Sequence, residues 1–247
     1  MSYREFFILV NLARSRQNSK QDYQRFENYQ GDLLVEYLCS HKVQIKNQLV
    51  LDIGCGYGGY TISLFEAGAK AIGLDLSIEP GLIKKGYLVS ADALLTPFSP
   101  SSFDLIICAS LIEHVPDPDL LIKEILRILK PGGTCYLSFP PFYTPIGGHQ
   151  FSPYHLLGQR IAIKIVPKRK LNLGHATTDV ETYQNAYGDY GLYPLTIRKI
   201  KKLLSKFQIR VIDQSTRWLP TNFSIIPLFG EFLTWHVQFL FVKENNE

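Results

Sequence analysis

Residues 50–59 read Val-Leu-Asp-Ile-Gly-Cys-Gly-Tyr-Gly-Gly, a short apolar run that ends in a glycine-rich loop. The apolar part, from Leu49 to Ile53, has the length and composition of a buried β-strand. Glycines let the backbone turn sharply and approach a ligand without a Cβ clash. A loop of this kind between a strand and a helix can hold the phosphates of a dinucleotide, or simply connect the two elements. Both interpretations stay open on the loop alone.

The chain around this loop alternates between strands and helices. Apolar runs predict strands, and three-to-four-residue spacing of apolar side chains predicts helices. The predicted strands are 49–53, 71–75, 87–90, 103–108, 134–139, 209–212 and 237–242, and the predicted helices are 58–68, 117–130 (stopped by Pro131-Gly132-Gly133) and 196–206. Strands that alternate with helices form right-handed βαβ units. We therefore expect an α/β fold with a doubly wound sheet, mostly parallel and covered on both faces.

Composition excludes several other classes of protein. The chain has 247 residues, of which 46% are apolar, and a formal charge of +4. A disordered chain would carry fewer apolar residues and more charge, and a disulfide scaffold would be shorter with more than the 4 cysteines present. The cysteines form no C-x-x-C pair, which favours reduced thiols in a cytoplasmic protein and argues against a structural zinc site. We predict neither a signal peptide nor a spanning helix, because Pro220, Pro227 and Glu231 interrupt the longest apolar tract.

Three acidic residues sit where the first three strands end. Asp52 lies two residues before Gly54, and a carboxylate there suits an ammonium ligand better than a pyrophosphate, which it would repel. Asp75 ends the second strand, where nucleotide folds place an acid that accepts from ribose hydroxyls. Asp92 follows the third strand and can accept from an adenine amino group. Together these residues predict a site for an adenosine that carries an amino acid and no phosphates.

The motifs in this order resemble the class I S-adenosylmethionine-dependent methyltransferases, in particular the group that contains ubiquinone and small-molecule methyltransferases. The matching segments are 50–59, 73–76, 91–93, 103–115 and 129–133, within about residues 45–140. The resemblance implies a Rossmann-like sheet of seven strands with an antiparallel last strand, and S-adenosylmethionine as cofactor. We expect an N-terminal helical preface over residues 1–45 and a methyltransferase domain over 46–247, with an acceptor-site insertion at about 140–193.

The resemblance also assigns residues to the cofactor. It implies that Asp52, Gly54 and Gly56 hold the methionine part, and that Asp75 and Leu76 hold the ribose and adenine. Asp92 and Ala93 are assigned to the adenine, and Ala109 to the rim near the sulfonium. Two roles are open for Tyr23 and Phe26, which either close over the sulfonium by a cation–π contact or pack in a helix core.

No metal is expected. Some quinone O-methyltransferases use a Glu-x-x-Glu-His arrangement to bind a divalent metal. This chain has Glu113-His114 but carries Ser110 at the first Glu position.

The segment from Phe139 to Phe151 follows the fifth strand and is expected to form the acceptor wall. His149 is our candidate for a catalytic general base, which an oxygen acceptor with a high pKa requires. A loop histidine bonded to backbone is the competing interpretation. His155 and His175 are weaker candidates for the same role.

The expected partner is a small-molecule acceptor, with the oxygen of a lipid, quinone or sugar-like metabolite as the first hypothesis. An RNA or protein methyltransferase and a non-catalytic cofactor-binding protein are the alternatives. Nucleic acid is disfavoured, because the Asn/Asp-Pro-Pro-Tyr/Phe motif of base methyltransferases is replaced by Ala109-Ser110-Leu111-Ile112. Two basic runs, 164–170 and 198–210, are either solvated faces or, with the aromatic tract 218–235, a surface for anionic lipid and peripheral membrane contact. The sequence leaves the oligomeric state open.

Overall fold

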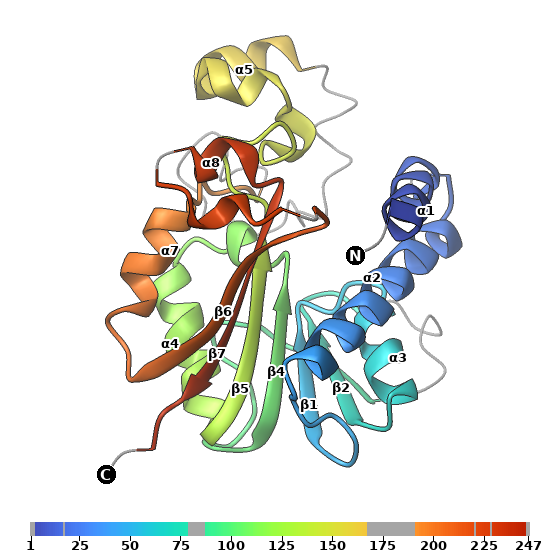
Figure 1. The fold of residues 1–247 in the computed structure, drawn as a ribbon, viewed down its shortest axis with the longest axis vertical. Coiled ribbons are helices and arrows are strands. Elements are labelled where there is room, and N and C mark those ends of the chain that lie inside the picture. The colour runs from blue at the N-terminus through green and yellow to red at the C-terminus, as the bar shows by residue number, and fades with distance from the viewer. Residues whose placement is uncertain are drawn as a thin grey trace.

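Seven strands form a single sheet in the order β3-β2-β1-β4-β5-β7-β6 (Figure 1). Their bounds are β1 Leu49–Ile53, β2 Lys70–Asp75, β3 Tyr87–Ser90, β4 Phe103–Ala109, β5 Leu129–Phe139, β6 Ile209–Arg217 and β7 His236–Lys243. Strands β1 to β5 pair in parallel, and β7 runs antiparallel to both β5 and β6. The prediction of a seven-stranded, mostly parallel sheet with an antiparallel last strand is therefore confirmed.

The computed structural model describes residues 3–16, 18–78, 87–166, 191–219, 221–227 and 229–245. The helices are α1 Tyr3–Ser15, α2 Lys20–Ser40, α3 Gly59–Glu66, α4 Pro118–Ile128, α5 Gln159–Ile165, α7 Ile197–Leu204 and α8 Gly230–Leu233. Short 3₁₀ helices are η1 Ile112–His114, η2 His149–Phe151, η3 Tyr154–Leu157 and η5 Phe223–Ile225. None of the helices within these ranges is both long enough and apolar enough to cross a membrane.

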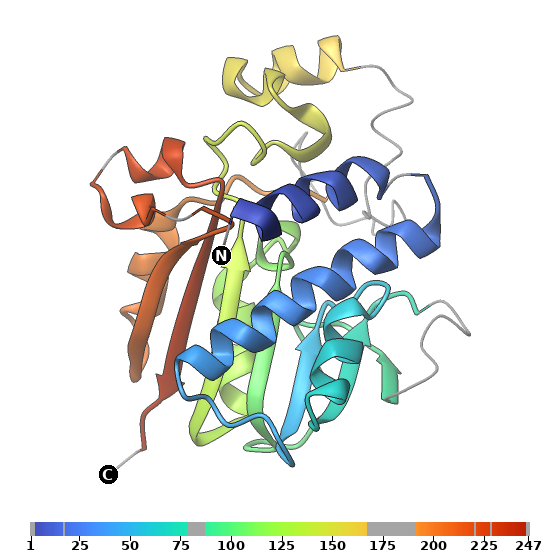
Figure 2. The same ribbon diagram turned by 45° about the vertical axis from the view of Figure 1, so that its right-hand side comes forward.

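Two apolar cores lie on the two faces of the sheet. On one face, α4 and α7 bury residues such as Ile125 and Ile200 against the strands. On the other face, α2 and α3 bury Leu34, Leu38 and Leu64. Figure 2 shows α1 crossing beside α2 at the upper end of the second face. The helical preface predicted over residues 1–45 thus contributes α2 to this core, so α2 is integral to the packing of the sheet.

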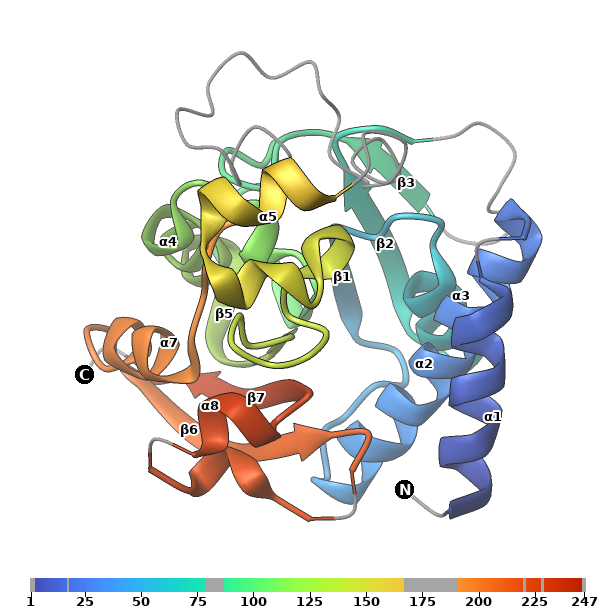
Figure 3. The ribbon, with the colours of Figure 1, turned by 90° about the horizontal axis from the view of Figure 1, so that it is seen from above.

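The carboxyl ends of the parallel strands point to one edge, which α5, α8 and the short 3₁₀ helices surround (Figures 1 and 3). Open α/β sheets bind ligands at this edge. The segment that follows β5 reaches α5 at this edge, and its role as an acceptor wall stays a prediction. Residues 167–190 of the predicted insertion lie outside the described residues.

The structure corrects the boundary between α4 and β5. The helix predicted over 117–130 ends at Ile128, because Leu129 already pairs with Phe103 of β4. The Pro131-Gly132-Gly133 turn, predicted as the helix stop, lies inside β5, where the pairing with β4 shifts register. Proline cannot donate to the ladder and Gly132 has a φ of +75°, so the strand is irregular rather than interrupted.

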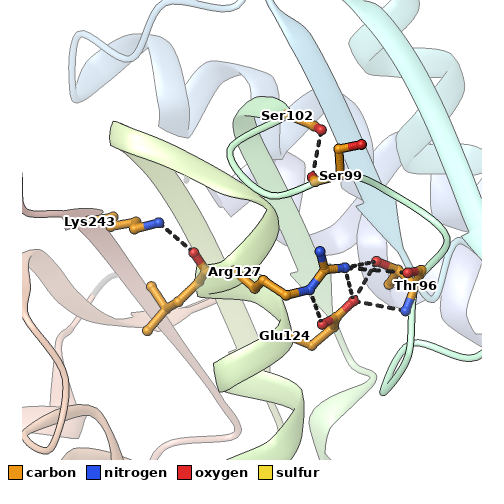
Figure 4. Close-up of polar contacts among 7 residues, drawn as sticks. Thr96, Ser99, Ser102, Glu124, Arg127 and Lys243 are labelled. Atoms are coloured by element: carbon orange, nitrogen blue, oxygen red, sulfur yellow. Dashed lines mark hydrogen bonds and ion pairs between the residues drawn. The ribbon is translucent and has the colours of Figure 1, made fainter.

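A buried carboxylate fastens α4 to the loop after β3 (Figure 4). Glu124 Oε1 accepts from Thr96 N at 2.8 Å and from Thr96 Oγ1 at 2.6 Å. The Arg127 guanidinium donates to both Glu124 oxygens at 2.7 Å. At the same C-terminal end of α4, Lys243 Nζ of β7 donates to Leu126 O and Leu129 O. These contacts fix α4 to both its neighbours without involving the carboxyl edge of β1.

Candidate active site

The glycine-rich loop is held against the end of β2 by its own backbone. Gly54 N and Cys55 N donate to Leu74 O at 2.7 and 3.0 Å. Gly54, Gly56 and Gly58 have φ values of +78°, +52° and +78°, a region in which a side chain is strained. The glycines are therefore required by the turn, and the loop delivers the chain to the first turn of α3.

Asp75 joins this loop to the adjacent strand. Its Oδ2 accepts from Gly56 N at 2.9 Å, and its Oδ1 accepts from Ser77 N at 3.3 Å. The side chain of the neighbouring Leu76 is 54% exposed, so it lies on the surface at this edge. The structure thus brings Gly56 and Asp75 together, as the assignment of both to one ligand requires. Whether they contact the cofactor stays a prediction.

The predicted adenine residues lie one strand further along. Asp75 pairs with Ser90 of β3, and Ala91 N donates to Asp75 O at 3.0 Å. Asp92 Oδ1 accepts from Leu94 N at 2.8 Å, whereas the side chain of Ala93 is buried. Asp92 and Ala93 therefore follow β3 at the same edge as Asp75. The connection between β2 and β3, which contains Pro80 and Gly81 and leads to these adenine residues, lies largely outside the described residues.

Asp52 is more enclosed than its assignment to the methionine part requires. Only 1% of the residue is exposed, and its Oδ2 accepts from Thr61 Oγ1 of α3 at 2.6 Å. Burial raises its pKa to about 7, which outweighs the opposing hydrogen bond from Thr61. Asp52 thus links β1 to α3 through Thr61, and a direct contact with a ligand stays a prediction.

A carboxylate that we did not predict lies above the same loop. Glu27 of α2 accepts from Gly59 N with its Oε2 at 3.4 Å. Burial, followed by the charges of Asp52 and Asp75, raises its pKa to about 8. The pattern of apolar residues on α2 marks its core face and contains no signal for this role, because Glu27 meets Gly59 only after α2 and α3 have packed.

The two aromatic candidates on α2 have different surroundings. The Tyr23 ring lies 5.1 Å from the ring of Tyr57 in the glycine-rich loop. Phe26 is buried, with the Arg16 guanidinium 5.2 Å from its ring centroid. Phe26 therefore packs among helices, and Tyr23 is the one that reaches the loop.

On the acceptor side, β4 ends at Ala109, which is buried and precedes a strained residue. Ser110 has a φ of +55°, and its Oγ lies 3.0 Å from His236 Nε2 at the start of β7. Burial, and then the charge of Arg217, hold the pKa of His236 well below its usual range. The predicted site did not include His236, because only the antiparallel insertion of β7 beside β5 brings it here.

His149 lies beside a buried carboxylate from η1. Its Nε2 is 3.8 Å from Glu113 Oε1, and His114 Nε2 is 3.9 Å from the same oxygen. Glu113 is 1% exposed, and within the described part of the chain neither of its side-chain oxygens has a hydrogen-bond partner. Burial raises its pKa to about 8. The three side chains also carry donor atoms of the kind that divalent cations take, so the prediction that no metal binds stays untested.

The remaining candidates are placed less favourably for catalysis. His155 is 2% exposed, and its Nε2 lies 3.1 Å from Thr144 O, so it braces the loop after β5. Burial lowers its pKa. His175 and the basic residues Lys168, Arg169 and Lys170 lie outside the described residues. Most of the second basic run lies on α7. This helix buries its apolar side and exposes its basic side chains, which are Arg198, Lys199, Lys201 and Lys202.

Comparison with known proteins agrees with this arrangement. Residues 51–137 match the family described as methyltransferase domain. An uncharacterized methyltransferase of Mycobacterium leprae is 32% identical over 176 residues, covering 67% of this chain and 60% of that protein. A ubiquinone biosynthesis O-methyltransferase of Methylococcus capsulatus is 35% identical over 117 residues, covering 43% of this chain and 48% of its own. This chain thus spans 60% or less of the length of these two relatives.

Solved structures share the fold at low identity. An S-adenosylmethionine-dependent methyltransferase from Clostridium acetobutylicum has a TM-score of 0.57 at 15% identity, covering 87% of this chain and 91% of that one. This likeness carries the fold alone. The matched segment is therefore a methyltransferase domain, and its strand order and solved neighbours give it the fold of the class I S-adenosylmethionine-dependent methyltransferases.

Proposed function

We propose that this chain binds S-adenosylmethionine at the carboxyl edge of β1 and β2 and transfers its methyl group to a small-molecule acceptor. The observation that carries the proposal is the joined arrangement of Gly56 and Asp75, whose backbone N–H and carboxylate meet at 2.9 Å. The charges of Asp52 and Asp75 act to raise the pKa of Glu27, and the charge of Asp75 acts to raise that of Asp52. The three carboxylates therefore lie close together, which suits a cationic ligand. A pyrophosphate would be repelled by the same charges.

The residues present fit this cofactor. The glycines leave the loop backbone open to close approach, and Asp75 can accept from ribose hydroxyls while Asp92 accepts from an adenine amino group. When bound, the cofactor supplies a methyl group already activated on a sulfonium. The protein's task is then to align the acceptor with that methyl and to exclude water, which contributes roughly 7–11 kcal/mol in ideal cases.

His149 is proposed as the general base for an oxygen acceptor. It lies in η2, in the segment after β5, where the acceptor wall was expected. A negative charge on Glu113, 3.8 Å from His149 Nε2, would stabilise the imidazolium that forms when His149 takes the acceptor's proton. Glu113 therefore has a positioning and electrostatic part in the proposal, and His149 receives the proton.

The acceptor class is proposed as the oxygen of a lipid, quinone or sugar-like metabolite. Support comes from the relative that is a ubiquinone biosynthesis O-methyltransferase and from the apolar surroundings of the acceptor side. Methylation of RNA or protein, and cofactor binding without catalysis, are the alternatives that an acceptor screen distinguishes. Transfer of labelled methyl into the small-molecule or lipid fraction supports the first proposal, and transfer only into RNA or protein contradicts it.

We further propose that the acceptor side contacts an anionic membrane surface. Large apolar side chains are exposed on η3, α5 and the segment around α8, at the edge shown from above in Figure 3. These are Tyr154, Leu156, Leu157, Ile161, Ile165, Ile225, Ile226, Phe229, Phe232, Leu233 and Trp235. Tyr143, in the segment that leads to η3, lies beside the group around α8, because its ring is 5.9 Å from that of Phe232.

On the side of η3 and α5, the charges around this surface have a single sign along the chain. Residues 125–178 contain no Asp or Glu, and α5 within them exposes Arg160 and Lys164 beside Ile161 and Ile165. An apolar surface framed by bases is typical of helices that lie in the headgroup region of anionic bilayers. An amphiphilic acceptor would reach the site from such a surface.

Titration calorimetry with S-adenosylmethionine tests the cofactor proposal. We expect saturable binding to the folded chain, reduced at least tenfold by Asp75→Ala, because the variant loses both a ribose acceptor and the brace on Gly56. Asp119→Ala, which removes a surface ion pair with Lys123, is the control and is expected to bind as the parent chain does. Undetectable binding by well-folded protein, or equal binding by Asp75→Ala, would overturn the proposal.

A further inference from the structure

Helix α2 packs directly on the segment that begins α3. A Cβ added at Gly59 would lie 2.3 Å from Glu27 Cβ and 2.5 Å from Asn28 N, so the two backbones meet with no room for a side chain. Gln24 Nε2 donates to Tyr57 O in the loop at 3.1 Å. Because contacts from Gln24 to Asn28 fix one turn of α2 over the loop, the side chain of Glu27 cannot move far from it.

The Glu27 carboxylate lies over the glycines. Its Oε2 accepts from Gly59 N at a long 3.4 Å, and its Oε1 is 3.0 Å from the position that a Cβ on Gly56 would occupy. A ligand that follows the loop from Gly56 to Gly59 must pass this carboxylate. The first turn of α3 is otherwise a place for an anion, because its N–H groups point outward there. The Glu27 carboxylate already occupies this position at the first turn of α3.

The charge around Glu27 is negative. Within the described part of the chain it makes no ion pair, and the ionised groups that shift its pKa are Asp52 of β1 and Asp75 of β2. The other titratable groups that interact with it are Tyr23 of α2, Cys55 in the loop and Tyr60 of α3, and Arg16, directly after α1, acts on Tyr23. A carboxylate group of a ligand would be repelled here, and an ammonium group would be attracted.

We propose that Glu27 binds the α-ammonium group of the cofactor and so sets the direction of its amino-acid part along the loop. The inference rests on the proposed function, since it concerns how the same cofactor is held. It adds to the site a residue from the N-terminal helices, outside the segment matched to the methyltransferase domain. Ammonium faces α3, and the ligand's carboxylate faces away from it.

A purely structural role for Glu27 predicts something different. A carboxylate that only caps α3 stabilises the helix through Gly59 N and its partial positive charge. Glutamine can still accept from Gly59 N, so Glu27→Gln keeps the cap and removes the charge. A capping role therefore predicts at most a small fall in Tm and no dependence on which ligand is bound.

Three ligands separate the two roles by calorimetry. S-adenosylmethionine and S-adenosylhomocysteine both carry the α-ammonium, and 5′-methylthioadenosine lacks the amino-acid part. We expect Glu27→Gln to lower the affinity for S-adenosylmethionine and S-adenosylhomocysteine by about tenfold. The affinity for 5′-methylthioadenosine should stay within twofold of that of the parent chain. Glu36→Gln, an exposed glutamate on the same helix, is the matched control and is expected to change none of them.

The proton count on binding gives a second, independent readout. Since Glu27 and Asp52 have pKa values of about 8 and about 7 without ligand, a bound ammonium is expected to displace protons at pH 7. If about one proton is released, the binding enthalpies measured in phosphate and in Tris should differ by the difference between the ionisation enthalpies of the two buffers. We expect this release to fall by more than half in Glu27→Gln and to persist in Glu36→Gln.

The outcomes are distinguishable. If the parent chain binds neither S-adenosylmethionine nor S-adenosylhomocysteine, the proposed function fails. If it binds both and Glu27→Gln binds them equally well, only the role of Glu27 is overturned. A uniform loss for all three ligands, or a loss for S-adenosylmethionine alone, also overturns it, because neither pattern reports the ammonium.

Discussion

Glu113 and His149 show how one residue acquires its chemistry from another that is distant in sequence. Glu113 follows β4 and is 1% exposed, and His149 comes from a loop that follows the next strand. An enclosed carboxylate without a hydrogen-bond partner in the described residues is costly to ionise, which is why its pKa rises to about 8. A proton on His149 would lower the cost of ionising Glu113. We therefore expect the Glu113 carboxylate and the His149 imidazolium to form together.

The variant His149→Ala tests the proposed role of His149 as general base. We expect kcat to fall by about 10²–10⁴, the usual contribution of a positioned base, with S-adenosylmethionine affinity within twofold of the parent. Initial rates on the acceptor fraction found by labelled-methyl transfer, and calorimetry in parallel, provide the measurement. His41→Ala, at the end of α2, serves as control. Full activity in His149→Ala would remove the assignment.

Among the helices, α4 is attached to the loop after β3 by one buried carboxylate, that of Glu124. Glu124 is 6% exposed and accepts from Thr96 and from Arg127 at the same time (Figure 4). Although burial acts to raise the pKa of Glu124, the hydrogen bonds from Arg127 and Thr96 prevail and lower it. A lowered carboxyl pKa contributes stability that is present above the unfolded pKa and is lost as pH falls through the folded value.

Glu124→Ala is therefore expected to lower the free energy of unfolding by about 2 kcal/mol, because it leaves buried donors of Thr96 without an acceptor. Urea titrations at pH 7 and at pH 3 check this: the difference between parent and variant should shrink at the lower pH. Cofactor affinity should not change, since the network contacts no residue of the glycine-rich loop. Glu66→Ala, at the end of α3, is a carboxylate control at another helix. An equal difference at both pH values would show that Glu124 contributes through packing and not through charge.

At the scale of the whole molecule, apolar side chains from two distant segments meet above the carboxyl edge of the sheet. The segment from Tyr154 to Ile165 and the segment from Ile225 to Trp235 are separated by 59 residues of the chain, yet both expose apolar side chains there. The hairpin of β6 and β7 carries the second segment back beside β5.

Vesicle sedimentation tests the proposed membrane surface. We expect the chain to bind vesicles that contain phosphatidylglycerol, to bind purely zwitterionic vesicles at least fivefold less, and to be released by about 0.5 M salt, which screens charge. Leu157→Asp is expected to reduce binding, whereas Leu120→Asp, at an exposed apolar position on α4, is not. No binding even at low salt, or dimerisation through this surface in place of binding, would contradict the proposal.

Local sequence patterns are enough to predict the doubly wound sheet, the glycine-rich loop and the acids at the strand ends, because these features follow from periodicity and from residues next to one another in the chain. Asp75 lies beside Gly56 as its position at the end of β2 indicated. Boundaries were less certain: Pro131-Gly132-Gly133 falls inside β5, because pairing with β4 already begins at Leu129.

The contacts that join distant segments could not be predicted in this way, because they depend on how the elements pack. Glu27 reaches the loop because α2 packs on α3, and His236 meets Ser110 because β7 inserts beside β5. Glu113 becomes a neighbour of His149 through the path of the chain after β5. Local patterns encode which face of an element is buried, but the side chains that face a ligand depend on how those elements are packed together.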